Sequence, residues 1–259
     1  MKSNVIISIL LLSSYLCSAQ EGSICFPDGI EFTAQSQIDS FQINNFSCKG
    51  IGGDLKINGN DIIDLSGLSR LTSVQGHLYI QNNNALASLS GLEGITYIGK
   101  SLLIWTNHAL MNLTGLQNIS FLGGGLSIKY NNSLTSLAGL EGLNHVSRNM
   151  AIYDNNALTD LTGLQHIKYI GEGLIIRDNN ALTSLTGLEG LTTIFRFNIG
   201  IINNDALTSL AGLENVNFGY YGGIGISDNN SLTDISAISN ISSHKINQIW
   251  FSDNLSLSY

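Results

Sequence analysis

One apolar pattern repeats along most of the chain, and its clearest copy spans residues 102–116. In that copy, leucine or isoleucine stands at Leu102, Ile104, Leu110, Leu113 and Leu116, and variable residues fill the positions between them. Further apolar residues follow at positions 119 and 122, and the pattern restarts at position 126. A unit that recurs at a fixed period predicts a solenoid, in which each repeat packs on its neighbours.

The first apolar position of the pattern recurs every 23 to 25 residues along the chain. It is occupied by Leu55, Leu78, Leu102, Leu126, Met150, Leu174, Ile199, Ile224 and Ile249. The alternation of this position with the next, as at Leu78 and Ile80, predicts a short strand with one buried face. The later apolar positions, 86, 89, 92, 95 and 98 in the same rung, are three residues apart, which favours tight turns or 3₁₀-like sides over a long helix.

An asparagine follows the second strand position by three residues, where the chain must turn away from the sheet. The column comprises Asn60, Asn83, Asn107, Asn131, Asn155, Asn179, Asn204, Asn229 and Asn254. An amide at this place can hydrogen-bond turn backbone groups and the equivalent amides of neighbouring rungs. We therefore predict a structural ladder. A row of metal or sugar ligands is the disfavoured alternative, because the column lies inside the apolar pattern.

The chain divides into three segments. Residues 1–19 resemble a secretory signal, with Lys2 before an apolar run that is too short to span a bilayer, and with small residues before a cut after Ala19. Residues 20–54 are predicted to form an N-terminal cap, and residues 55–259 about nine rungs of solenoid. The mature chain is expected to contain no transmembrane span, and its location is expected to be secreted or at the cell surface.

The predicted cap contains the two cysteines that remain after cleavage, Cys25 and Cys48. An even number of cysteines in an exported protein predicts a disulfide between them. Between the cysteines, residues 33–41 have the pattern of a short helix. Thr33 is its expected N-cap, and Ile38 and Phe41 lie on the same face.

Composition and charge narrow the range of functions. The chain has 259 residues, 43% hydrophobic and 12% charged, and its regular apolar spacing favours one long repeat domain. The net charge of −8 argues against nucleic-acid binding, which needs a basic surface. The five histidines fall at unrelated positions of the repeat, and no zinc spacing or nucleophile–base arrangement is present. We therefore expect no catalysis, no cofactor and no metal.

The outward strand positions of the middle rungs carry aromatic and basic residues. They are Trp105, Lys129, Tyr130, Tyr153 and Arg177. Exposed aromatic residues beside basic groups on a rigid sheet are typical of a surface that contacts a protein or a carbohydrate. The alternative is that tryptophan and tyrosine are present only because they suit strands, and the sequence does not decide between the two interpretations.

Two further groups of residues are candidates for chemistry. Asp154 and Asp178 would lie about 5 Å apart on successive rungs, which allows a Ca²⁺ site. With Arg177 beside them, they could also form the centre of a Ca²⁺-assisted polysaccharide lyase, although solvated turn carboxylates are the favoured interpretation. The aromatic group Phe195, Phe197, Tyr220 and Tyr221 is expected only to cover two rungs distorted by one-residue insertions.

The repeat, L-x-I-x-x-N-N-x-x-L-x-x-L-x-G-L after a cysteine-bounded cap, resembles the receptor L domain, the leucine-rich-repeat-like module of insulin and growth-factor receptor ectodomains. It is most similar to the exported bacterial proteins that carry this repeat. The resemblance covers about 200 residues. It implies a mainly β, right-handed β-helix-like solenoid with one parallel sheet of short strands, and a role in binding.

This chain departs from the family at its C-terminus. It stops at Tyr259 within a repeat and lacks the usual C-terminal cap. It is expected either to be a fragment or to pair its last rung with a partner. The expected function is a binding or adhesion module for a protein or glycan. A lyase and a purely structural surface repeat are the alternatives.

Overall fold

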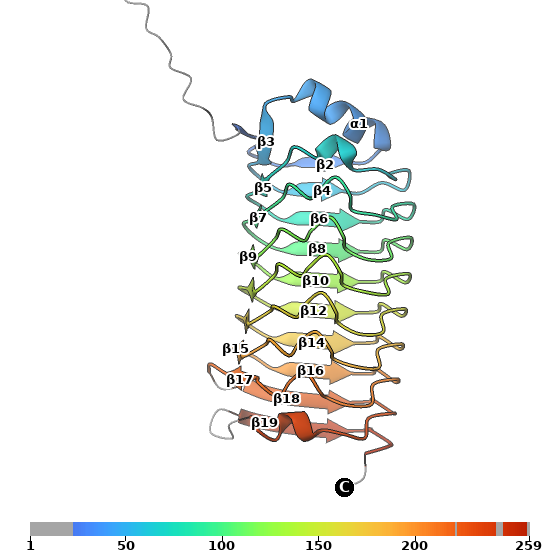
Figure 1. The fold of residues 1–259 in the computed structure, drawn as a ribbon, viewed down its shortest axis with the longest axis vertical. Helices are drawn as coiled ribbons and strands as arrows, with labels where there is room; N and C mark the ends of the chain where they lie inside the picture. Colours follow the sequence, from blue (N-terminus) through green and yellow to red (C-terminus); the bar gives the residue numbers. More distant parts are fainter. Residues whose placement is uncertain (1–22, 221, 242–245, 258–259) are drawn as a thin grey trace, which may run out of the picture.

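The computed structural model describes residues 23–220, 222–241 and 246–257, and these form a solenoid of stacked rungs (Figure 1). The predicted signal at residues 1–19, and Tyr221, lie outside the described residues. No helix within the described ranges has the length and apolar character needed to span a bilayer. The fold is mainly β with rungs of about 24 residues, as the repeat predicts.

One side of the solenoid is a ten-stranded parallel sheet in the order β19-β18-β16-β14-β12-β10-β8-β6-β4-β2. Its strands are β2 (Ile30–Phe32), β4 (Leu55–Ile57), β6 (Leu78–Gln81), β8 (Leu102–Trp105), β10 (Leu126–Lys129), β12 (Met150–Tyr153), β14 (Leu174–Arg177), β16 (Ile199–Ile202), β18 (Gly222–Ser227) and β19 (Ile246–Ser252). From β6 to β16, equivalent repeat positions are paired directly across neighbouring strands, such as Leu102 with Leu126. Buried and outward residues alternate along these strands, as predicted.

A second parallel sheet forms another side of the solenoid, whereas the resemblance implied only one sheet. Its nine strands are β1 (Ser23–Cys25), β3 (Cys48–Ile51), β5 (Ser73–Val74), β7 (Tyr97–Ile98), β9 (Phe121–Leu122), β11 (His145–Val146), β13 (Tyr169–Ile170), β15 (Thr193–Ile194) and β17 (Asn217–Phe218). Most of these strands have two residues, one outward and one buried. Two residues are too few to show alternation in a sequence.

The predicted apolar positions form the core. Leu78, Ile80, Leu86, Leu89 and Leu92 all have 0% of their surface exposed. Each buried aliphatic side chain contributes about 1.5 to 3 kcal/mol before the entropy of ordering the rung is subtracted. The turns between them are tight, as predicted: the N–H of Leu92 donates to the carbonyl of Leu89 at 3.1 Å. The 3₁₀ helices η1 (Ser66–Leu68) and η2 (Ser236–Ile238) occupy this side at either end.

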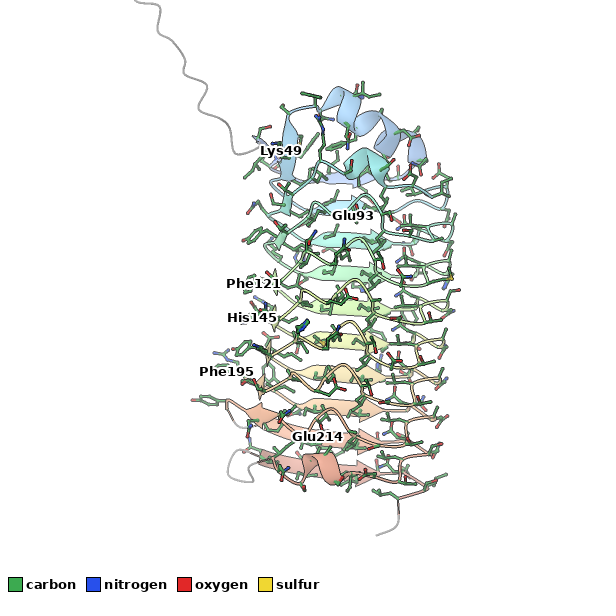
Figure 2. All side chains as sticks on the ribbon, in the orientation of Figure 1. Lys49, Glu93, Phe121, His145, Phe195 and Glu214 are labelled. Carbon is green, nitrogen blue, oxygen red and sulfur yellow. A yellow bond between two sulfur atoms is a disulfide. The ribbon has the colours of Figure 1, made fainter. Side chains whose placement is uncertain are left out.

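The glycine of the Gly-Leu corner has a structural explanation. Gly91 has a φ of +108°, and a Cβ atom there would collide with the carbonyl of Leu65 in the preceding rung. The Gly91 N–H donates to the Glu93 carboxylate at 2.8 Å, and the same bond joins Gly212 to Glu214 at 2.9 Å. Glu93 and Glu214 therefore lie on the same side of the solenoid in different rungs (Figure 2). These two glutamates stabilise corners of the fold.

The asparagine column forms the predicted ladder. The Asn131 Nδ2 group donates to Asn155 Oδ1 at 3.1 Å and to the Ile104 carbonyl at 3.0 Å, and Asn131 Oδ1 accepts the Asn107 backbone N–H at 3.0 Å. The buried members are Asn83, Asn107, Asn131, Asn155, Asn179, Asn204, Asn229 and Asn254. Because every amide group is used by neighbouring rungs, these side chains are structural.

The assignment of Asn60 to the ladder is wrong. Gly59 takes the ladder place, and its backbone N–H donates to Asn83 Oδ1 at 2.9 Å. The turn after β4 is one residue shorter than its counterparts, so Asn60 shifts outward and is exposed. There it accepts a hydrogen bond from Asn84 Nδ2 at 2.8 Å.

The N-terminal segment contains the predicted disulfide between Cys25 and Cys48, whose Cα atoms are 5.9 Å apart. Helix α1 (Gln35–Asn44) lies over the first rung, with Ile38 and Phe41 buried as predicted (Figure 1). Its N-cap is Ala34, and the assignment of Thr33 is wrong. The Gln37 side chain accepts the backbone N–H of Thr33 at 2.6 Å and that of Ala34 at 3.2 Å, which fixes the helix start.

The same segment also supplies strands to both sheets. Ile30 in β2 pairs with Leu55 in β4, and Gly50 in β3 pairs with Ser73 in β5. The hydrogen bonding of both sheets therefore continues across position 54, where the cap was expected to end.

Candidate ligand-binding face

The outer face of the ten-stranded sheet brings the predicted site residues together. Trp105, Lys129, Tyr153 and Arg177 are paired in register on β8, β10, β12 and β14. The core fixes the inward residues of these strands, so the four outward side chains project from a rigid sheet. Trp105, Lys129 and Tyr153 are half-buried, whereas Arg177 is exposed.

Basic groups and aromatic rings alternate along this row. The Lys129 ammonium lies 3.9 Å from the Trp105 ring centroid, 5.6 Å from that of Tyr153 and 5.7 Å from that of Tyr130. The Arg177 guanidinium lies 4.7 Å from the Tyr153 ring centroid. Cations over ring faces are attracted by the ring quadrupole. We call these five residues, Trp105, Lys129, Tyr130, Tyr153 and Arg177, the aromatic–cation row.

The row extends toward the N-terminus by residues that the sequence did not single out for the site. Tyr79 contacts Trp105 edge to face, with centroids 6.3 Å apart, and the Lys56 ammonium lies 5.7 Å from the Tyr79 ring centroid. The Trp105 indole N–H donates to Ser127 Oγ at 2.9 Å, which fixes the orientation of the indole. Both Tyr79 and Lys56 occupy outward strand positions, and this position in the repeat is the sequence feature that could have identified them as part of the site.

The residue after each of these strands adopts a left-handed backbone conformation. The positions are Asn82, Thr106, Tyr130, Asp154, Asp178, Asn203, Asp228 and Asp253, with φ between 53° and 59°. Asparagine and aspartate tolerate this region, whereas a β-branched or bulky side chain does so at a cost. Thr106 and Tyr130 are the two residues in this column that are neither asparagine nor aspartate. Thr106 directly follows Trp105, and Tyr130 directly follows Lys129. Such strain is concentrated at functional sites in proteins.

Contacts of its side chain compensate for the strain at Tyr130. Its ring packs edge to face on Tyr153, with centroids 5.9 Å apart. Its hydroxyl also interacts favourably with the Asp154 carboxylate. Burial and the nearby Asp178 raise the pKa of Asp154, while Arg177, the Tyr130 hydroxyl and Lys129 lower it.

The second aspartate of the proposed Ca²⁺ pair has protein partners. Asp178 Oδ2 lies 3.6 Å from Arg177 Nε, and Asp178 Oδ1 accepts a hydrogen bond from Asn203 Nδ2 at 2.7 Å. In the described part of the chain, no group of three or more histidine, cysteine, aspartate or glutamate side chains is placed to hold a metal ion. The partners of Asp178 fit the interpretation of a turn carboxylate.

The second aromatic group only partly has the covering role expected of it. The Phe195 ring lies where a Cβ atom of Gly219 would be, so Phe195 does cover the next rung. Phe197 and Tyr220 are 54% and 65% exposed, so these two side chains cover the rungs less completely. The extra residues of the longer rungs place the two side chains outside the regular surface.

An aromatic stack that the sequence did not predict lies on the nine-stranded sheet. Ring centroids are 4.9 Å apart between Phe121 and His145, 4.5 Å between His145 and Tyr169, and 6.3 Å between Tyr169 and Phe195. Figure 2 shows Phe121, His145 and Phe195 along one edge of the solenoid. Burial lowers the pKa of His145. Because each stacked ring covers a face of its neighbour, we interpret the stack as structural.

Comparison with known proteins identifies one matching family. Residues 47–139 match the family model of the Receptor L domain, a ligand-binding type of module. The matched range runs from β3 into the turns after β10 and includes Trp105, Lys129 and Tyr130. No curated protein and no solved structure matches the chain.

Proposed function

We propose that this chain is a non-catalytic binding module, exported or held at the cell surface, whose aromatic–cation row binds a protein or a glycan. The Receptor L domain match over residues 47–139 supports a binding role. We further propose that the same module continues through the later rungs, because their strands keep the register of the matched ones.

One observation carries the proposal: the Lys129 ammonium lies within 6 Å of three aromatic rings on a rigid outer sheet face. Tyrosine, tryptophan and arginine are enriched among the residues that dominate binding energy at interfaces. The left-handed backbone of Thr106 and Tyr130 adds support, because the fold accepts strain at the same place.

Export is supported by the disulfide between Cys25 and Cys48. Disulfides persist in oxidising compartments and are rare in the cytosol. The signal-like residues 1–19 agree with this placement.

The test is a binding screen of residues 20–259 against surface proteins and glycans, with and without Ca²⁺. A Trp105→Ala/Tyr153→Ala double variant should lose saturable binding to any ligand found. Its melting temperature should fall by no more than a few degrees, because both side chains lie outside the core.

The matched control is Phe46→Ala. Phe46 is an exposed ring with the Arg70 guanidinium 4.2 Å from its centroid, but it lies on the N-terminal segment away from the row. This variant should bind like the parent chain. Equal binding by the double variant would contradict the proposal. Release of unsaturated products from acidic polysaccharides would favour a lyase, and the absence of any saturable ligand would favour a structural repeat.

A further inference from the structure

A hollow of about 720 Å³ lies on the outer face of the ten-stranded sheet, and Tyr153 and Arg177 are among the residues that line it. Its apolar walls are Ile175, Ile202, Phe197 and Trp250. Ligand sites in proteins have volumes of about 300 to 1,000 Å³ and are mostly apolar with a few placed polar groups. The volume and lining of this hollow fit that description.

Glycines create the hollow. Gly200 stands in the outward column between Ile175 and Gly225, and a Cβ atom there would meet only Ile202 Cδ1, at 3.8 Å. Gly223 and Gly225 leave room for the Trp250 indole, which lies against β18 where their Cβ atoms would be. The indole is therefore fixed close to the sheet surface, and it forms a preorganised end wall.

Arg177 is the only charged side chain among the described residues that line the hollow. Its guanidinium packs on the Tyr153 ring, with 4.7 Å to the centroid, and Nε lies 3.6 Å from Asp178. Its terminal amino groups have no hydrogen-bond partner among the described residues. A planar guanidinium with free donors matches the geometry of a carboxylate.

Among the described residues, only three other polar side chains line the hollow, those of Asn149, Tyr153 and Asn198. Asn149 donates to Glu172 at 2.5 Å and accepts the Gly173 backbone N–H at 3.0 Å, so both ends of its amide are already used. A sugar ring would bring several hydroxyl groups that need partners. An apolar side chain needs none, and an adjacent carboxylate would meet Arg177.

We infer that this hollow binds a segment of a partner protein that places an apolar side chain beside a carboxylate. The inference takes from the proposed function only that the strand face is the binding face. Its energetics depend on Arg177, Gly200 and Trp250 rather than on Trp105 and Lys129. An open position on a sheet suits a segment of a larger partner, which continues across the surface on either side.

The test uses Trp250 as its reporter. The chain has two tryptophans, so in a Trp105→Phe background Trp250 is the single one. The probe is the capped peptide acetyl-Gly-Asp-Phe-Gly-amide, which should change the Trp250 fluorescence saturably. The same peptide with asparagine in place of aspartate should bind about tenfold more weakly, because it loses the charge-assisted hydrogen bonds.

Two protein variants make the result specific. Arg177→Gln should weaken the aspartate peptide to the level of the asparagine peptide and leave the asparagine peptide unchanged. Gly200→Leu should fill the hollow and abolish binding of both peptides. The matched control, Gln81→Leu, adds the same side chain on the outer face of β6, away from the hollow, and should bind like the background. Circular dichroism and melting temperature verify that each variant is folded.

Equal affinity for the two peptides, unchanged binding by folded Gly200→Leu, or tighter binding of phenylacetate than of the aspartate peptide would each overturn the inference. Tyr153 and Arg177 belong to both the hollow and the row, whereas Gly200 lines only the hollow and Trp105 lies only in the row. The Gly200→Leu result, measured without Trp105, therefore tests the hollow alone. The hollow and the aromatic–cation row can therefore fail separately.

Discussion

The Lys129 ammonium lies 3.9 Å from the centroid of the Trp105 ring on the adjacent strand. The pair is part of a sheet whose inward residues are fully buried, so the backbone holds the two side chains in register. The indole is also fixed by its hydrogen bond to Ser127 Oγ, at 2.9 Å. The cation therefore rests on a ring that is already oriented.

Replacing Lys129 with methionine should test the energy of this contact. Methionine keeps an aliphatic side chain but removes the charge, so the free energy of unfolding should fall by about 0.5 to 1 kcal/mol. Urea denaturation followed by circular dichroism measures the change. Lys100→Met is the control, because Lys100 is exposed. Equal effects of the two variants would show that the ring contacts of Lys129 contribute nothing.

The asparagine ladder should be the most sensitive polar feature of the fold. Asn131→Ala removes the donor to the Ile104 and Lys129 carbonyls and the acceptor for Asn107. Each buried group left without a partner costs about 1 to 3 kcal/mol, so we expect a loss of about 2 to 4 kcal/mol in the free energy of unfolding. Chemical denaturation would measure this loss.

Asn60→Ala is the matched control for the ladder. Asn60 is exposed and accepts only from Asn84, so its replacement should change the free energy of unfolding by about 0.5 kcal/mol or less. A loss as large as that of Asn131→Ala would contradict the assignment of Gly59 to the ladder.

The parts of the fold that depend on periodicity could be predicted from the sequence. The leucine positions, nine of the ten strands of the larger sheet and eight of the nine ladder asparagines follow from it. Asn60 could not be assigned, because a turn one residue shorter moves the ladder place onto Gly59. The smaller sheet could not be predicted, because strands such as Tyr97–Ile98 have no alternation.

For the candidate site, the sequence predicts which side chains lie near one another but not how they are oriented. Register places Trp105, Lys129 and Tyr153 on neighbouring strands. The position of the ammonium over the rings depends on side-chain rotamers, and the left-handed backbone at Tyr130 depends on the turn. The hollow beside Trp250 exists because Gly200 and Gly225 have no side chains. The pattern of apolar positions does not predict a hollow at outward glycines.

The pKa of Asp154 gives the stability a pH dependence of known sign. Burial and Asp178 raise this pKa above 3.8, so the folded state binds the proton more tightly than the unfolded state does. The stabilisation is present below pH 3.8 and is lost as pH rises through the raised pKa. The stability of Asp154→Asn relative to the parent chain should therefore increase as the pH is raised from 3 to 7. Denaturation curves at several pH values measure the difference, and a constant difference would contradict the shift.

His145 should produce the opposite slope. Burial within the aromatic stack lowers its pKa below 6.5, so the unfolded state binds the proton more tightly. Its contribution is present above pH 6.5 and is lost as pH falls through the lowered pKa. The parent chain should lose stability between pH 7 and pH 5 relative to His145→Phe, which keeps a ring in the stack. The pKa of His77 is lowered too, but His77 is present in both chains and cancels in the difference.

The disulfide should stabilise the N-terminal rungs rather than the whole solenoid. Removing it with Cys25→Ser/Cys48→Ser frees a loop of about 24 residues and should cost about 3 kcal/mol, by the chain-entropy model. In a solenoid each rung contacts only its neighbours, so the loss should spread weakly along the axis. Hydrogen exchange should accelerate in α1, β1 and β3, which lie nearest the bond, and should stay unchanged from β12 onward. Reducing the parent chain should reproduce this pattern. Uniform acceleration along all rungs would mean that the rungs unfold as one cooperative unit. Unchanged protection of α1 would mean that its buried residues, Ile38 and Phe41, hold the helix in place without the disulfide.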